Sequence, residues 1–472
     1  MERKTKIVAT LGPACASYER IRELVAAGMD VARLNFSHGD YKTHRQLCDW
    51  VRAAAEEEKR VVAVLQDVQG PKIRVGTFAG GSCELKTGSE VRLVAGEGEG
   101  DCDTVYVNYP HLTEDIQPGE RVVLADGLIR LEVSGHAPHG LRARVLIGGT
   151  LGDQKGVAFP QSELRMPAIT DKDRRDLAFG RELGVDMVAA SFVRSAADVK
   201  LVAALAGEET PIVAKIELAA GYQNLDGILD TAPAIMVARG DLGVQLPLEK
   251  IPLIQLDILS RTNRAGRVAI TATEMLESMT KATRPTRAEV TDVASAVLAG
   301  TDAVMLSAET ATGNHPVRSV EVMDIICREV EGSLGPPSFG HGLLEDGDER
   351  FPSATAKAAV EAASSLGIET IVAFTESGNS ARLLSKYRPL ARIIAFTPEP
   401  RTLARMALYW GVRPLPFQRL DSTDQMIAYA EKKVLELGIC KPGDGVVIVA
   451  GVPPNERHST NLMKLHWVTS HP

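Results

Sequence analysis

The fold class is indicated most clearly by two stretches, Pro211-Ile-Val-Ala-Lys-Ile-Glu217 and Ala234-Ile-Met-Val-Ala-Arg-Gly-Asp241. Each is a short run of Val, Ile, Ala and Met residues that ends in charged residues. Near-continuous apolar runs of this length are typical of parallel strands that are covered on both faces. A buried strand has no structural reason to end in two charges, so both runs point to a functional site at their carboxyl ends.

Six further apolar runs end in the same way. They are Lys6–Gly12, Asp30–Phe36, Val61–Asp67, Val185–Phe192, Val268–Thr273 and Ala303–Glu309. Helical stretches separate most of the eight runs, which is the pattern of βα units. Eight such units predict an α/β protein built on a (β/α)8 TIM barrel, whose chemistry lies at the carboxyl ends of its strands.

Polar residues at these carboxyl ends form the candidate site. They are Thr10, Arg33, Asn35, Asp67, Ser191, Lys215, Glu217, Arg239, Asp241, Thr273, Ser307 and Glu309. Side chains on a strand alternate with a period of two, so Lys215 and Glu217 share a face. One such pair alone would suit a solvated salt bridge at the barrel rim equally well. Repetition on five strands favours a single site, because charged residues are rarely buried unless they are paired or bound to a ligand.

Composition limits the classes of function. The chain has 472 residues, too many for one hydrophobic core, and this length predicts two or three domains. A net charge of −8 argues against general binding of nucleic acid or membrane surfaces. The sequence has no signal-peptide pattern and no apolar run of about 18 residues. Its six cysteines form no CxxC motif, which is typical of reduced thiols in a cytoplasmic protein.

One interval between the apolar runs is unusually long. More than a hundred residues separate Asp67 from Val185, and they contain short alternating strands with Gly-rich turns. This pattern predicts an all-β barrel domain inserted after the third strand. Its expected strands are Ser89–Ala95, Thr104–Asn108, Glu120–Leu124, Leu128–Ser134 and Leu141–Ile147. Thr170 is the expected N-cap of the helix that follows.

A second, smaller α/β domain is expected after the Gly/Pro-rich linker Gly335–Gly347. Its buried-strand runs are Ile371–Thr375, Ile393–Phe396 and Val446–Ala450. The predicted division is therefore residues 1–70 and 165–334 for the barrel, 71–164 for the inserted domain and 335–472 for the carboxyl-terminal domain.

The chemistry expected at the site is phosphoryl transfer. Glu217 and Asp241 are suitable ligands for one Mg²⁺, with Mn²⁺ as a substitute, because Mg²⁺ typically takes one or two carboxylates with substrate oxygens and water. Lys215 would place an ammonium beside the metal, where it can neutralise a phosphoryl group in transfer. Gly240 lets backbone amides approach an anion closely, and Thr273 offers a hydroxyl opposite.

Two histidines follow the second apolar run. His38 lies near the proposed site in sequence. His44 is expected on the surface of the following helix, with no part in the chemistry.

The motifs closely resemble those of the pyruvate kinase family. The resemblance rests on Thr5–Ala14, Met29–Gly39, Gly70–Arg74, Ala189–Val193, Lys215–Glu217, Met236–Gly243, Met275–Met279, Arg284–Glu289 and Met305–Thr310. It runs in order from the first strand to Met463. It implies Mg²⁺-dependent phosphoryl transfer from phosphoenolpyruvate to ADP, the final step of glycolysis, which gives pyruvate and ATP through a pyruvate enolate.

The resemblance also implies roles for single residues on the substrate side. Arg33 would grip the transferring phosphoryl group, and Lys215 would stabilise its transition state. The amides of Gly240 and Asp241, with the Thr273 hydroxyl, would hold the pyruvate carboxylate.

Further roles concern the enolate and the nucleotide. Ser307 would help to protonate the enolate through water. The residues that match nucleotide-side positions are Asn35, Phe36, Ser37, His38, Arg74 and Lys155. Arg74 and Lys155 lie near the two ends of the inserted domain, which suggests that this domain closes over the site as a lid.

The sequence departs from the family at a monovalent-cation pocket. Many members bind K⁺ with groups equivalent to Asn35, Ser37, Asp67 and the carbonyl of Val68. Those members usually carry Glu where this chain has Lys72, a difference of two charge units. A fixed ammonium would replace the mobile cation, so we expect catalysis not to require K⁺. The alternative is that Lys72 points to solvent at the lid hinge.

The segment Thr375-Glu376-Ser377-Gly378-Asn379-Ser380 is a candidate effector site. It lies between a buried strand and a helix and offers hydroxyls and amides to a phosphate, although an ordinary N-cap loop would look similar. Related enzymes bind a sugar-phosphate activator at this loop. Asn379 stands where members that bind a bisphosphate often have Arg, so we expect a sugar monophosphate or AMP. The resemblance also implies a homotetramer.

Two other functions compete with this reading. Another metal-dependent phosphoenolpyruvate/pyruvate-barrel enzyme, a lyase, would use Glu217 and Asp241 but would not need the lid or Arg74. A catalytically silent phosphosugar sensor would work through the carboxyl-terminal domain. Every proposed catalytic position is filled, which disfavours the sensor.

Overall fold

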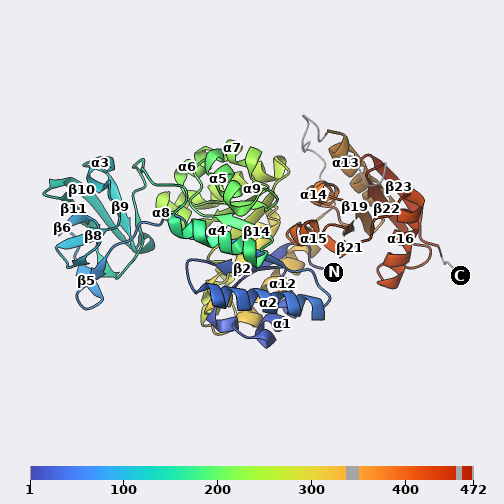
Figure 1. Ribbon diagram of the computed structural model, residues 1–472, viewed down its shortest axis with the longest axis horizontal. Helices are drawn as coiled ribbons and strands as arrows, with labels where there is room; N and C mark the ends of the chain where they lie inside the picture. The colour runs from blue at the N-terminus through green and yellow to red at the C-terminus, as the bar shows by residue number, and fades with distance from the viewer. Residues whose placement is uncertain (1, 336–349, 453–459, 470–472) are drawn as a thin grey trace.

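The computed structural model describes residues 2–335, 350–452 and 460–469. Figure 1 shows a central barrel, with the inserted lid on one side and the carboxyl-terminal domain on the opposite side. The predicted linker lies, after Gly335, outside the described residues. The three domain boundaries named above stay predictions.

Eight parallel strands close the barrel in the order β1-β18-β17-β16-β15-β14-β3-β2, which confirms the predicted (β/α)8 fold. They are β1 (Lys6–Leu11), β2 (Val31–Asn35), β3 (Ala63–Asp67), β14 (Met187–Ala190), β15 (Ile212–Ile216), β16 (Ala234–Ala238), β17 (Val268–Ala272) and β18 (Ala303–Leu306). Asp67 is in register with Asn35 on one side and Ala189 on the other. The carboxyl ends of neighbouring strands therefore meet at one rim.

Helices surround these strands. They are α1 (Tyr18–Ala27), α2 (Tyr41–Glu57), α4 (Asp171–Leu183), α5 (Ala196–Ala206), α6 (Ala219–Gln223), α7 (Leu225–Thr231), α8 (Arg239–Gln245), α9 (Ile251–Arg264), α10 (Arg287–Leu298), α11 (Ala308–Ala311) and α12 (Pro316–Gly332). Thr170 caps α4 as predicted, and with Asp173 it forms a capping box that satisfies two backbone amides of the first turn. The chain thus returns from the lid into a firmly started helix.

The lid is built mainly of strands. They are β4 (Thr77–Phe78), β5 (Ser82–Leu85), β6 (Glu90–Ala95), β7 (Glu99–Gly100), β8 (Thr104–Val107), β9 (Arg121–Leu124), β10 (Ile129–Ala137), β11 (Gly140–Ile147), β12 (Gly149–Gly152) and β13 (Val157–Ala158), with one short helix, α3 (Leu112–Asp115). Six of them form one sheet, in the order β13-β9-β10-β11-β6-β8, and the others form two-stranded pairs. The five predicted strands are present with shifted ends.

The carboxyl-terminal domain has a five-stranded sheet in the order β21-β20-β19-β22-β23. Its strands are β19 (Thr370–Phe374), β20 (Arg392–Thr397), β21 (Val412–Pro416), β22 (Gly445–Ala450) and β23 (Leu462–Trp467), and its helices are α13 (Arg350–Leu366), α14 (Asn379–Lys386), α15 (Pro400–Met406) and α16 (Thr423–Glu436). The three predicted strands are confirmed, and β23 pairs antiparallel with β22 at the sheet edge.

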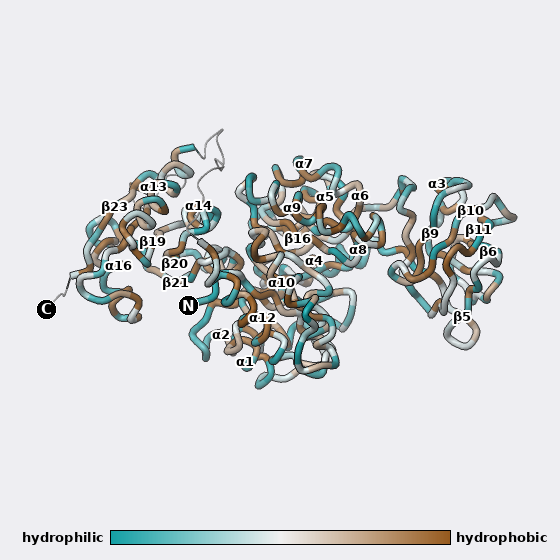
Figure 2. The backbone as a smooth tube through the Cα atoms, turned by 180° about the vertical axis from the view of Figure 1, so that it is seen from behind, coloured by the Kyte–Doolittle hydropathy of each residue, from teal (hydrophilic) through white to brown (hydrophobic). Residues whose placement is uncertain are grey.

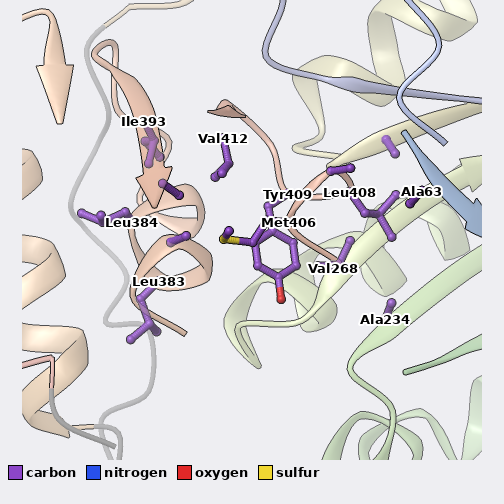
Figure 3. Packing of buried hydrophobic residues seen from close by; sticks show 14 of the residues in the cluster. Ala63, Ala234, Val268, Leu383, Leu384, Ile393, Met406, Leu408, Tyr409 and Val412 are labelled. Carbon is purple, nitrogen blue, oxygen red and sulfur yellow. The ribbon is translucent and has the colours of Figure 1, made fainter. Parts of the chain in front are cut away.

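The carboxyl-terminal domain closes the amino end of the barrel. Leu408 and Tyr409 share a buried apolar cluster with Ala63, Ala234 and Val268, which are the first residues of β3, β16 and β17 (Figure 3). Figure 2 shows apolar segments inside the barrel, the lid and the carboxyl-terminal domain. The amino end of the barrel is opposite to the rim that carries the candidate site.

A buried ion cluster reinforces this contact. Asp302, just before β18, pairs with Lys386 of α14 and lies 2.8 Å from Arg388 Nη1. Both cations belong to the carboxyl-terminal domain.

Within the part of the chain that the structure describes, no helix is long and apolar enough to cross a bilayer.

Candidate active site

A chain of alternating charges crosses the carboxyl end of the barrel. Asp67, with 1% of its side chain exposed, accepts a hydrogen bond from Arg33 Nε at 2.7 Å through Oδ2. Its Oδ1 lies 3.2 Å from Lys215 Nζ, which is 2.8 Å from Glu217 Oε1. The structure therefore brings together four of the predicted residues, from β2, β3, β15 and the residue that follows β15. Removing Asp67 would leave the buried Arg33 without its carboxylate partner.

The neighbours of each group set its protonation. Burial alone would lower the pKa of Lys215, but Asp67 and Glu217 together raise it above its usual range, so the ammonium stays charged. Burial opposes ionisation of Asp67, yet Lys215 and Arg33 hold its pKa below the ordinary value. Burial raises the pKa of Glu217 to about 7, against the effect of Lys215 and with a further contribution from the charge of Asp241.

Glu217 and Asp241 fit a divalent cation. Glu217 Oε2 accepts a hydrogen bond from the Phe192 amide at 2.7 Å, which fixes the carboxylate. The mutual repulsion of the two carboxylates is the condition that a cation between them would relieve. No group of three or more His, Cys, Asp or Glu suited to a metal occurs among the described residues. The chain thus supplies two carboxylates, as is usual for Mg²⁺ that also binds substrate oxygens and water.

Lys72 reaches this carboxylate pair from the lid. Its Nζ lies 3.6 Å from Asp241 Oδ1, and about a third of each side chain is exposed. The ammonium of Lys72 therefore lies beside a candidate Mg²⁺ ligand. The predicted monovalent-cation pocket is described by a separate contact, in which the Val68 carbonyl accepts a hydrogen bond from Ser191 Oγ at 2.7 Å.

The turn after β17 presents Thr273 to the start of α8. Thr273 and Glu274 both have positive φ, of 67° and 53°, which is a strained conformation for residues with side chains. In this turn Thr273 Oγ1 accepts a hydrogen bond from the Gly240 amide at 2.9 Å. The predicted anion-binding amide and hydroxyl therefore lie side by side.

Two strand-end residues have structural partners instead. Arg239 pairs with Asp292 at 2.6 Å and donates to the carbonyl of Thr273, so it holds the strained turn. Glu309 is fully buried and accepts hydrogen bonds from the amides of Leu276 and Ser307. The expectation that every strand-end charge faces the site is wrong for these two residues.

The loop after β2 carries the predicted nucleotide-side residues. Asn35 Oδ1 accepts a hydrogen bond from the Ser37 amide at 3.1 Å, and the His38 amide donates to the Asn35 carbonyl at 3.2 Å. The expectation of a surface position for His44 is wrong. Only 5% of it is exposed, because its ring stacks on Phe36 at 4.1 Å and its Nε2 lies 2.9 Å from the His38 carbonyl.

The lid contributes Arg74 and Lys155. A strand-like bridge pairs Arg74 with Gly156, and Arg74 Nη1 donates to the Gln154 carbonyl at 2.9 Å. The two predicted lid residues are therefore neighbours. At the hinge, Gly70 has a φ of +69°, and a Cβ there would lie 2.8 Å from the Phe192 ring, so only glycine fits.

The lid and the barrel enclose a cavity of about 460 Å³. Lys72 and Asp126 line it from the lid, and Arg194, Glu217 and Asp241 line it from the barrel. The candidate metal ligands therefore open into a space large enough for a small anionic substrate.

The predicted effector loop belongs to the carboxyl-terminal domain, on the side of the barrel opposite to the lid (Figure 1). Thr375, Glu376, Ser377, Asn379 and Ser380 line a cavity of about 710 Å³ between the barrel and the carboxyl-terminal domain. Arg267 from the barrel and Arg382 and Arg405 from the other domain also line this cavity.

Sequence reasoning missed three residues of α4: Lys172, Asp173 and Asp176. Lys172 contacts the nucleotide-side loop, Asp173 contacts the lid hinge, and Asp176 contacts the Tyr41 hydroxyl at the start of α2. Only the capping pattern of Thr170 marked this segment, and a cap carries no functional signal.

Comparisons with known proteins agree with this geometry. The family model described as "Pyruvate kinase, barrel domain" matches residues 2–320, and the one described as "Pyruvate kinase, alpha/beta domain" matches residues 353–466. A pyruvate kinase of Geobacillus stearothermophilus is 43% identical over 475 residues, covering 99% of this chain and 81% of its own. One of Mycobacterium tuberculosis (strain CDC 1551 / Oshkosh) is 43% identical over 478 residues and 99% of each chain. The crystal structure of a Cryptosporidium parvum pyruvate kinase matches with a TM-score of 0.93 at 37% identity, over 99% of this chain and 96% of that one.

The Glu217→Gln substitution tests the electrostatic account of the carboxylate pair. It removes one of two repelling charges, while Lys215 keeps Asp67 as its partner. We expect the protein in EDTA to unfold at a higher temperature than the unmodified protein, and its Mn²⁺ affinity to fall at least about 10-fold. Calorimetry and Mn²⁺ titration measure the two effects. Glu249→Gln, at an exposed position, is the control. Unchanged Mn²⁺ binding would contradict the assignment.

Proposed function

Since the chain belongs to the pyruvate kinase family of phosphotransferases, we propose that it transfers the phosphoryl group of phosphoenolpyruvate to ADP in a Mg²⁺-dependent reaction. The products are pyruvate and ATP. The observation that carries this proposal is the buried network of Arg33, Asp67, Lys215 and Glu217 beside Asp241.

The network suits charge stabilisation during phosphoryl transfer. Arg33 binds the phosphoryl group, and Lys215, which its acidic neighbours keep charged, stabilises the negative charge on the oxygens in transit. Because both cations are already oriented by Asp67, little reorganisation accompanies the reaction. Glu217 and Asp241 would hold Mg²⁺, which supplies further neutralisation of phosphate charge when bound.

The strained turn holds the other end of the substrate. The hydroxyl of Thr273 and the amides of Gly240 and Asp241 bind the carboxylate of pyruvate and of its enolate. Their proximity, at 2.9 Å between Gly240 N and Thr273 Oγ1, supports this assignment. Ser307, at the end of β18, acts in protonation of the enolate through water.

The nucleotide lies between the barrel and the lid. Asn35, Phe36, Ser37 and His38 bind it from the barrel side, and Arg74 and Lys155 bind it from the lid. Closure of the lid about Gly70 brings the two sets together and excludes water from the transfer.

A coupled assay of ATP formation from ADP and phosphoenolpyruvate tests the reaction, and Lys215→Met tests its mechanism. We expect kcat to fall about 10³-fold or more, because the lost charge acts mainly in the transition state. Lys200→Met, on the exposed face of α5, is the control. Near-normal turnover of folded Lys215→Met would refute the role. Absence of ATP formation by the unmodified enzyme would favour the lyase.

We propose further that catalysis does not require K⁺. Asn35, Ser37, Asp67 and the Val68 carbonyl form the candidate pocket for a monovalent cation. Lys72 supports independence from K⁺ because it brings a tethered positive charge to the seam between lid and barrel, 3.6 Å from Asp241. A tethered charge avoids the entropic cost of capturing a free ion.

The dependence on monovalent cations can be measured directly. In tetramethylammonium buffer without K⁺ we expect nearly full activity, and Lys72→Glu should create a requirement for K⁺ because it restores the negative charge. Lys86→Glu, at an exposed position in the lid, controls for a general charge effect. Collapse of the unmodified enzyme's activity without K⁺ would overturn the proposal.

The cavity behind the loop 375–380 supports allosteric activation by a phosphorylated ligand. Ser377, Asn379 and Ser380 offer polar groups, and the arginines that line the cavity supply positive charge. The Nε of Arg405 is buried without a hydrogen-bond partner in the described structure. A sugar monophosphate or AMP would satisfy such a group with its phosphate.

A panel of effectors tests this assignment. We expect sugar monophosphates or AMP to activate more strongly than fructose 1,6-bisphosphate, and Ser377→Asp to abolish the activation because it places a negative charge against the phosphate. Titrations of activity at subsaturating phosphoenolpyruvate measure both effects. Strongest activation by fructose 1,6-bisphosphate would contradict the preference.

We also propose a cytoplasmic homotetramer. Exposed apolar side chains on the barrel helices support association, since Leu253 of α9, Leu298 of α10 and Ile325 of α12 are each more than half exposed. We propose the predicted domain division as well, with residues 1–70 and 165–334 in the barrel, 71–164 in the lid and 335–472 in the carboxyl-terminal domain.

A further inference from the structure

The first turns of α4 touch the nucleotide-side loop. Lys172 Nζ donates to the Phe36 carbonyl at 2.6 Å and to Asp176 Oδ2 at 2.6 Å. Asp176 has 1% of its side chain exposed and also accepts a hydrogen bond from the Tyr41 hydroxyl at 2.8 Å. The ammonium therefore joins a buried carboxylate on the helix to a backbone carbonyl within the loop.

Aromatic packing fixes the same loop against the same helix. Phe179 of α4 stacks on Tyr41 with ring centroids 4.3 Å apart, and it lies 6.2 Å from Phe36. Phe36 of the loop and Tyr41 at the start of α2 thus pack on α4 through their rings, while Lys172 sets the direction of the Phe36 carbonyl.

The helix also holds the lid hinge. Asp173 is fully buried, and its Oδ1 accepts a hydrogen bond from the Gly70 amide at 3.0 Å. Its Oδ2 accepts one from the Thr170 amide at 2.9 Å. Gly70 precedes the lid and Thr170 follows it, so one carboxylate joins the two chain segments that connect the lid to the barrel.

We infer that Lys172 is a positioning residue for the nucleotide: it acts through the Phe36 carbonyl to hold the loop Asn35–His38 in its binding conformation. This inference rests on the proposed function, because it takes that loop as the ADP side of the site. An ordinary i,i+4 surface pair on a helix contributes little to stability and would not affect substrate binding. The additional bond to the loop carbonyl distinguishes Lys172 from such a pair.

The predicted kinetic signature is selective. In Lys172→Met the Phe36 carbonyl loses its donor. We therefore expect KM for ADP to rise about 5- to 10-fold, which is the loss of affinity expected when one partly exposed, charge-assisted hydrogen bond is removed. KM for phosphoenolpyruvate and kcat should stay within about 2-fold, because Arg33 and Lys215 are held by other groups. Lys172→Arg should restore KM for ADP in part, since it also donates. Lys200→Met is the surface control.

A double variant separates positioning from stability. Lys172→Met leaves the buried carboxylate of Asp176 with the Tyr41 hydroxyl as its remaining side-chain partner, which can loosen α4. Lys172→Met/Asp176→Asn removes that charge and still lacks the donor. We expect its stability to recover while KM for ADP stays raised.

Three results would overturn the inference. They are an unchanged KM for ADP in folded Lys172→Met, an equal rise in KM for phosphoenolpyruvate, and a normal KM for ADP in the double variant. Failure of the unmodified enzyme to form ATP would instead overturn the proposed reaction, so the two failures are distinguishable.

Discussion

The charges of Arg33, Asp67, Lys215 and Glu217 alternate in sign, and this alternation ties the fold of the barrel to its site. Each of these groups would be costly to bury alone, and each is tolerated because its neighbour has the opposite sign. β15 lies far from β2 and β3 in sequence and is separated from β3 by β14 in the barrel, so the four side chains meet only when the barrel closes in register. A slip of one residue would turn these side chains to the opposite face, so the fold and the site require the same pairing.

The lid is added to this barrel without interrupting its register. Both chain connections pass one buried carboxylate, Asp173, so the lid is joined to the barrel at a compact point near β3 and α4. Gly70 is required there because its backbone has positive φ and the Phe192 ring occupies the space of a side chain. If the lid closes as proposed, it turns about this small hinge while the ion network at the rim stays intact.

The sequence was sufficient for the barrel, the insertion and most of the ion network, because buried parallel strands have a strong apolar signal and their charged ends are conspicuous. It was less informative where long-range contacts decide. Arg239 and Glu309 look like site residues in sequence, but Asp292 and two backbone amides engage them. His44 becomes buried only because Phe36 stacks on it. β4, with two residues, is too short for any periodicity, and Lys172 could not be assigned because its partner is a carbonyl distant in sequence.

Leu408 and Tyr409 close the floor of the barrel, so the proposed effector cavity and the candidate site face opposite ends of the same strands. Val213 of β15 lines that cavity, and Lys215 follows two residues later on the same strand. Thermodynamic linkage then applies in both directions: a ligand that tightens substrate binding by some factor is itself bound more tightly by that factor when substrate is present. Such an enzyme would respond to the coincidence of two metabolites, and its effector would be retained longest in cells where phosphoenolpyruvate has already accumulated.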